Sequence, residues 1–192
     1  IKNATSTDVN NFFGIIGFVV KNAVISINIS DTVNNGDIVT SGNHSGGIIG
    51  GIYEGATALT ISFTNCANYG TITGKSYVGG LISKATAKTT IVITNSHNYG
   101  EIKATESYAG GIIGFSLADS INTLSNCTNS AKITAITYAS GIVGGCNWNV
   151  SMVITDCSNS GYITATGAYA GGITAYIHKG GNYFKNNVEG CT

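Results

Sequence analysis

The chain has 192 residues, of which 43% are hydrophobic and only 9% are charged, and nine lysines balance nine acidic residues. Zero net charge excludes the basic surface that nucleic-acid binding requires, and so much apolar content excludes a disordered chain. The longest apolar run, residues 12–20, is shorter than the roughly 20 residues of a membrane-spanning helix. We therefore expect no nucleic-acid partner and no direct membrane insertion.

A glycine-rich phrase headed by an aromatic residue or histidine recurs along the whole chain. Successive copies start 30 to 33 residues apart, at Phe12, His44, Tyr77, Tyr108, Tyr138 and Tyr169. Between them lies a second phrase, which occupies residues 61–70, 91–100, 122–131 and 152–161. A third, shorter run follows it directly, as at Thr71-Ile72 and Glu101-Ile102. These runs are β-branched and separated by Gly, Asn or Ser, which is the pattern of short strands, and their apolar residues lack helical spacing.

A repeat of this period is typical of solenoids, so the sequence predicts an all-β fold. We expect a parallel β-solenoid (β-helix) of about six coils of ~30 residues, with about three short strands in each coil. It forms one domain over residues 1–192, with a divergent first coil (1–36), four regular coils (37–161) and a last coil (162–192) that is degraded after Tyr176. At about 4.8 Å per coil, the rod is about 29 Å long.

The sequences Gly47–Gly50, Gly111–Gly114 and Gly141–Gly144, each followed by an Asn-Cys-x-Asn-x-Gly-like phrase, resemble the GLUG repeat. That repeat is found in large cell-surface proteins, including adhesins and the non-catalytic regions of IgA-cleaving peptidases. The resemblance covers nearly the whole chain, although the last glycine is replaced at Ser83 and Ala175. It implies display at the cell surface or outside the cell, and it carries over no catalytic residue.

Equivalent positions of a solenoid stack into columns, and the clearest column consists of asparagines. Its members are Asn34, Asn68, Asn98, Asn129 and Asn159. Stacked side-chain amides form hydrogen bonds along the axis, and asparagine tolerates the left-handed backbone of a turn, so we expect a structural ladder at a turn. The glycine pair in every coil predicts a bend or a close backbone approach.

The aromatic column allows two interpretations. Tyr77, Tyr108, Tyr138 and Tyr169 form either a core ladder or, if they face solvent, a strip on which sugar rings stack. Two adjacent apolar columns follow, headed by Ile15 and Ile16. Neighbouring strand residues point to opposite faces. Either a corner turns both columns inward, or one column is an exposed apolar stripe.

Three of the five cysteines share a column with Ser96, namely Cys66, Cys127 and Cys157. We expect a stack of thiols there. A disulfide between Cys127 and Cys157 is the alternative, because adjacent coils lie within disulfide range. Cys146 and Cys191 are expected outside this column, and no Cys/His spacing indicates zinc.

Four N-glycosylation candidates lie in Asn-x-Ser/Thr sequences, at Asn3, Asn28, Asn43 and Asn149. A fifth such sequence starts at Asn126, where we expect a ladder that leaves no room for a glycan. The acidic residues are dispersed among the columns, and Glu101 and Lys132 are placed to form an ion pair. We therefore expect no catalytic residues, no cofactor and no metal.

The sequence thus predicts a non-catalytic extracellular or cell-surface module with a structural role. It would serve as a stalk or filament subunit that assembles end to end with copies of itself or with further repeats of the same chain. One alternative is an adhesin that binds surface glycans through an outward tyrosine ladder. Another is an ice-binding solenoid that uses Thr73, Thr134 and Thr164, a column interrupted by Lys103.

Overall fold

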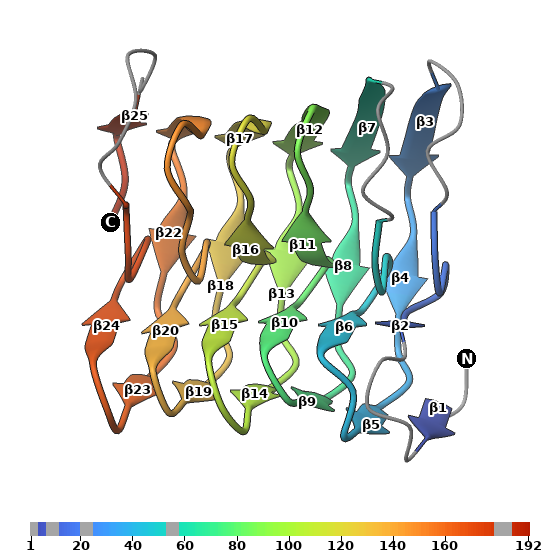
Figure 1. Cartoon of the computed structure of the whole chain (residues 1–192), viewed down its shortest axis with the longest axis vertical. Helices are drawn as coiled ribbons and strands as arrows, with labels where there is room; N and C mark the ends of the chain where they lie inside the picture. The colour runs from blue at the N-terminus through green and yellow to red at the C-terminus, as the bar shows by residue number, and fades with distance from the viewer. Residues whose placement is uncertain (1–3, 7–11, 20–24, 53–57, 179–185) are drawn as a thin grey trace.

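The computed structural model describes residues 4–6, 12–19, 25–52, 58–178 and 186–192. These residues form strands and turns with no helix, and every strand pairs in parallel with the equivalent strand of an adjacent coil. The chain is a parallel β-solenoid of about five turns, which confirms the predicted fold class. Figure 1 shows the coils side by side in a row, with β1 near one end and β25 at the other.

A regular coil passes through five sheets, which we number along the chain. Its strands are β7 (Leu59–Thr64) in sheet 1, β8 (Ala67–Asn68) in sheet 2, β9 (Ile72–Gly74) in sheet 3, β10 (Tyr77–Gly79) in sheet 4 and β11 (Ile82–Ala85) in sheet 5. The prediction of three strands per coil is therefore too low. The backbone breaks within the predicted runs; for example, the left-handed residue Asn65 (φ 56°) separates β7 from β8.

The other strands extend these five sheets. Sheet 1 also contains β3 (Ile25–Ser30), β12 (Thr89–Thr94), β17 (Ile121–Ser125), β21 (Ser151–Thr155) and β25 (Asn186–Glu189). Sheet 2 contains β4 (Val33–Asn34), β13 (His97–Asn98), β18 (Thr128–Asn129) and β22 (Ser158–Asn159). Sheet 3 contains β1 (Ala4–Ser6), β5 (Ile38–Thr40), β14 (Ile102–Ala104), β19 (Ile133–Ala135) and β23 (Ile163–Ala165). Sheet 4 contains β2 (Phe12–Phe13), β6 (His44–Gly46), β15 (Tyr108–Gly110), β20 (Tyr138–Ser140) and β24 (Tyr169–Gly171), and sheet 5 contains β16 (Ile113–Ser116).

Both apolar columns that follow the glycines lie in the core. Ile48 and Ile49 are each fully buried, and so are their equivalents Ile112 and Ile113 two coils later. The chain turns a corner between sheets 4 and 5 at this point, so consecutive side chains enter the interior from two walls. Of the two predicted alternatives, a corner that turns both columns inward is therefore correct for the regular coils.

The asparagine column is a continuous, buried ladder. From Asn34 to Asn129, the side-chain Nδ2 donates to the Oδ1 of the next asparagine at 2.7–2.8 Å. The same Nδ2 also donates to the carbonyl two residues later, as in Asn98 to Gly100 (2.9 Å). The left-handed residues other than glycine, however, belong to two other columns, one formed by Asp31, Asn65, Asn95, Asn126 and Asp156 and the other by Lys88, Asp119 and Asn149. The predicted ladder is present, but left-handed geometry is not the reason for its asparagines.

The second glycine of each pair lies where two coils approach closely. A Cβ on Gly111 would lie 2.0 Å from the carbonyl oxygen of Gly141 and 2.9 Å from the side chain of Asn129. Gly47, Gly80 and Gly141 have the same two kinds of neighbour. The glycine column therefore packs directly against the asparagine ladder, and a close approach explains it.

The C-terminal segment, residues 186–192, follows the same repeat as the preceding coils. Strand β25 pairs with β21 in sheet 1, and Gly190 (φ 63°) takes the left-handed position that Asp156 holds one coil earlier. Thr192 N–H donates to the Cys157 carbonyl at 3.1 Å, and its carbonyl accepts from Asn159 N–H at 2.8 Å. Residues 186–192 thus rebuild the first part of a further coil.

Candidate functional surfaces

The tyrosine column is a stacked ladder at the surface. The ring centroids of successive members from Tyr77 to Tyr169 are 5.6, 4.6 and 5.7 Å apart, with interplanar angles of 8°, 9° and 22°. Tyr77, Tyr108 and Tyr138 are half-buried, whereas Tyr169 in the last coil is 55% exposed. Because the rings cover one another's faces, the inner members offer a ligand their edges and hydroxyl groups but no open face.

A second column flanks this ladder, seven residues further along each coil. Lys84 Nζ lies 5.3 Å from the centroid of Tyr77, and the rings of Phe115 and Tyr108 are 4.2 Å apart. Tyr176 lies 5.0 Å from Tyr138. These contacts cover one side of the ladder and hold its rings in place.

The ladder is poorly suited to acid–base chemistry near neutral pH. Burial, and then the neighbouring tyrosines, raise the pKa of Tyr108 to about 12. Burial, and then the charge of Lys84, lower the pKa of His44 to about 4. Both groups are therefore neutral at pH 7, and a general base or acid works best with a pKa near the operating pH.

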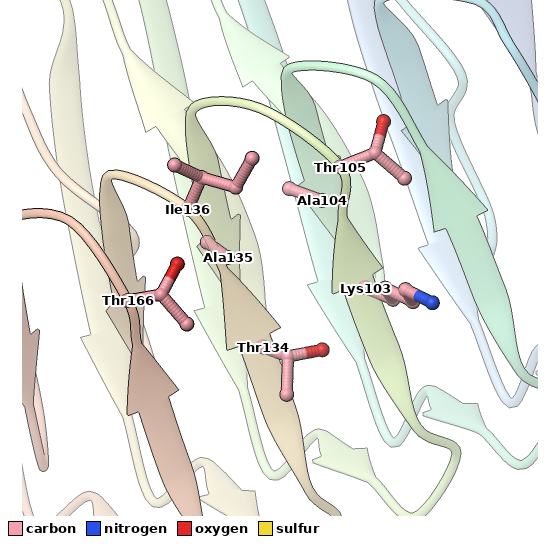
Figure 2. A pocket seen from close by; sticks show the side chains of 7 residues that line it. All are labelled: Lys103, Ala104, Thr105, Thr134, Ala135, Ile136 and Thr166. Carbon is pink, nitrogen blue, oxygen red and sulfur yellow. The ribbon is translucent and has the colours of Figure 1, made fainter.

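A shallow recess of about 270 Å³ lies at the corner between sheets 3 and 4 (Figure 2). The corner after β19 has two residues, 136–137, whereas the corners after β14 and β23 have three. The recess is lined by Lys103, Ala104, Thr105, Thr134, Ala135, Ile136 and Thr166.

The lining of the recess favours weak binding over catalysis. Alanines and Ile136 supply the apolar surface, and threonines supply hydroxyl groups. Lys103 is the one charged residue of the lining, so no nucleophile–base pair is formed there. Neither the recess nor its corner-length pattern was anticipated from the sequence, although the alternating corner lengths are visible in it.

An exposed aromatic pair was also missed by the sequence analysis. Tyr69 and Tyr99 are 53% and 45% exposed and stack at 4.7 Å, with His97 6.0 Å from Tyr99. The repeated Asn-Tyr-Gly at 68–70 and 98–100 is the signal that could have indicated it.

The cysteine column is longer than predicted. Cys191 joins it, contrary to the expectation, because its Sγ contacts the Ile154 carbonyl just as Cys127 Sγ contacts the Ile93 carbonyl. All five cysteines are free thiols in the structure, and the Cys127 N–H donates to Cys157 Sγ at 3.4 Å. The hydrogen bond between these two thiols, and then burial, raise the pKa of Cys127, which disfavours a reactive thiolate.

The glycosylation candidates fall in different surroundings. Asn28 is exposed on β3, and Asn43 lies partly exposed at a corner. Asn149 is a left-handed turn residue (φ 57°) whose side chain donates to Asp119. Asn126 belongs to a ladder as expected, because its Nδ2 donates to Asn95 at 2.7 Å, and Asn3 lies outside the described residues. Use of these sequences stays a prediction.

The charged residues form pairs across coils. Lys132 and Glu101 lie 3.5 Å apart, as predicted, and Lys75 and Glu106 form a second pair at 3.3 Å. Within the described ranges no group of three or more His, Cys, Asp or Glu residues could hold a metal. The same part of the chain holds no helix with the length and hydropathy of a membrane span.

Comparison with known proteins gives no match: no family model fits the chain, and no curated protein or solved structure matches it. The resemblance to GLUG repeats therefore stays a prediction, and the function must be inferred from the geometry of the chain itself.

Proposed function

We propose that this chain is a non-catalytic structural module, a stalk or filament subunit displayed outside the cell. Its solenoid continues beyond its own coils by end-to-end pairing with a further coil of the same kind. The observation that carries this proposal is the uncovered edge at the C-terminal end, where ladders that run through the whole body are left open.

The last coil covers only part of this end. Strand β25 and Thr192 pair with sheets 1 and 2, whereas β23 and β24 are edge strands among the described residues. Tyr162 is 85% exposed, and Ile163 and Ile173 are partly exposed, although their equivalents one coil earlier are fully buried. Unpaired strand edges with apolar side chains are templates for further pairing.

The asparagine ladder is open at the same place. Asn159 accepts from Asn129, and its own Nδ2 donates to the Gly161 carbonyl at 3.1 Å. Unlike the other members, Asn159 donates to no asparagine of a following coil among the described residues. A further coil would supply that acceptor, and the zero net charge of the chain removes long-range repulsion between copies.

Gly172 provides a sharp test of end-to-end pairing. A Cβ on Gly141 would lie 2.1 Å from the Gly172 carbonyl, whereas a Cβ on Gly172 meets no described atom within 4 Å. Gly172→Val is therefore compatible with the isolated chain but blocks a further coil. Thr164→Val, at an exposed outward position of β23, is the matched control.

We expect sedimentation of the 192-residue chain to show growing assemblies as concentration rises. Gly172→Val should stay monomeric with an unchanged melting temperature, and Thr164→Val should assemble like the original chain. A strictly monomeric original chain at high concentration, or equal assembly of Gly172→Val, would refute the proposal.

Binding of surface glycans is the weaker candidate. The stacking of Tyr77, Tyr108 and Tyr138 leaves ring edges to a ligand, and sugar stacking needs ring faces. Tyr169 and the Tyr69–Tyr99 pair expose more of their rings and are the better residues for such binding. A glycan array with and without Tyr69→Ala tests this alternative.

A further inference from the structure

In its first five strands, the outward face of sheet 1 is a regular array of short, uncharged side chains, and the sixth strand, β25, places the charged Glu189 beside Thr155. From β3 to β21, five strands present three outward positions each, and the register aligns these positions into three columns. Eleven of the fifteen positions carry a hydroxyl group, namely Ser26, Ser30, Thr60, Ser62, Thr64, Thr90, Thr94, Thr123, Ser125, Ser151 and Thr155. The other four are Asn28, Val92, Ile121 and Val153.

The geometry of this face is fixed by the fold. Neighbouring strands lie about 4.8 Å apart, and residues i and i+2 of a strand lie about 6.6 Å apart, so the hydroxyl groups sit on a rectangular grid. The β-branched side chains among them, Thr, Val and Ile, have a restricted χ1 angle, which limits the positions that their hydroxyl and methyl groups take. Ser125 Oγ donates to Thr94 Oγ1 at 3.3 Å, so neighbouring rungs are in lateral contact.

The chemistry of the face excludes most partners. Its fifteen positions include no charged residue, which argues against anionic or cationic ligands, and no aromatic ring on which sugars could stack. Between its outermost positions the grid covers about 13 by 19 Å, or about 250 Å², by strand spacing. That area is well below the ~800 Å² per partner of a stable protein interface.

We propose that this face binds the surface of ice. A rigid grid of hydroxyl groups anchors water by hydrogen bonds, while the methyl groups of Thr, Val and Ile order the water beside them. Water arranged on a two-dimensional repeat of this kind joins a growing ice surface, whose oxygen atoms also repeat on a fixed grid. The face lies on sheet 1, not on the sheet 3 column of Thr73, Thr134 and Thr164, where the exposed Lys103 interrupts the array.

The test is ice-affinity partitioning with two matched lysine substitutions. Thr123→Lys places a charge in the middle column of the grid, beside its central residue Val92, whereas Thr73→Lys places one in the sheet 3 column beside Lys103, where lysine is already accommodated. Gly172→Val in all samples keeps end-to-end assembly out of the measurement, and circular dichroism checks that each variant is folded.

We expect the Gly172→Val protein without a lysine substitution (the parent), and the same protein with Thr73→Lys, to be taken up into slowly growing ice and to show thermal hysteresis. Thr123→Lys should lose both. Exclusion of the parent from ice, or equal uptake of the two lysine variants, would overturn the inference. A third outcome would assign the face to a neutral polysaccharide instead. In that case the protein without a lysine substitution is excluded from ice but binds crystalline cellulose, and Thr123→Lys abolishes the binding to cellulose.

Discussion

Glycine and asparagine residues on facing walls set how closely the coils stack. The Cβ position of Gly111 is occupied by the Gly141 carbonyl and the Asn129 side chain, so only glycine fits there. Two residues earlier in the same coil, Ala109 is also fully buried, but its column holds Val78. The two sites are equally buried and differ in whether the backbone leaves room for a side chain.

Gly111→Val is therefore expected to be far more destabilising than Ala109→Val. Overpacking a site closed by backbone costs about 1–3 kcal/mol or more, whereas valine at 109 repeats what the neighbouring coil already accommodates. Urea midpoints of the two variants measure the difference. Equal midpoints would show that the glycine column is incidental.

His44, which stacks on Tyr77 in the tyrosine ladder, makes the stability of the folded chain depend on pH. Its pKa is about 4 in the folded chain, compared with 6.5 for an unperturbed histidine, because burial and then Lys84 disfavour the charged ring. Between these two values the unfolded chain binds a proton that the folded chain does not. The stability that His44 contributes above pH 6.5 is thus lost as the pH falls toward 4.

We expect His44→Tyr, which extends the column of Tyr77, to lose less stability than the original chain between pH 7 and pH 4.5. Urea unfolding at the two pH values measures the change, and the carboxyl groups common to both proteins cancel in the comparison. The same loss in both proteins would contradict the assignment.

At the scale of the element, the tyrosine ladder of sheet 4 is an ordered edge of the solenoid. Tyr108 stacks on Tyr77 and Tyr138 and lies against Phe115, whereas the exposed Tyr69 stacks on Tyr99 alone among the residues that the structure describes. Each aromatic pair contributes about 0.5–1.5 kcal/mol beyond the area that it buries. The ladder therefore stabilises the coil stack more than the exposed pair does.

Tyr108→Ala is expected to lower the free energy of unfolding by about 2–4 kcal/mol, and Tyr69→Ala by about 1 kcal/mol or less. Chemical denaturation followed by far-ultraviolet circular dichroism gives both values. A larger effect at position 69 would mean that the ladder adds little to stability.

At the scale of the whole molecule, the described acidic residues are dispersed, and no two of them share a column in adjacent coils. Glu101 and Glu106 pair with lysines of neighbouring coils, and Asp119 accepts from Asn149. Enzymes that cleave polysaccharides bring carboxylates together, and the described acids are used singly for lateral contacts.

The chain is accordingly expected to have no hydrolase or lyase activity on a panel of polysaccharides. Reducing-end and unsaturated-product assays measure this directly. Turnover that disappears when a single Asp or Glu is replaced would show that a catalytic group had been missed.

The sequence alone determined the period, the fold class and the columns. In a parallel stack, residues one period apart must become neighbours, so the Asn34–Asn159 ladder and the Glu101–Lys132 pair follow from spacing. The same logic explains the free-thiol column of Cys66, Cys127 and Cys157. The period was lost after Tyr176, so the return of Cys191 to that column could not be predicted.

The tertiary structure alone decided which way the columns face. Spacing fixes contacts along the axis, but the direction of a side chain depends on where the coil bends across the axis. The corner between sheets 4 and 5 turns both Ile112 and Ile113 inward, and a left-handed residue such as Asn65 splits one predicted run into two strands. Those bends arise from packing between opposite walls, such as Gly111 against Asn129, and a one-dimensional repeat carries no information about that contact.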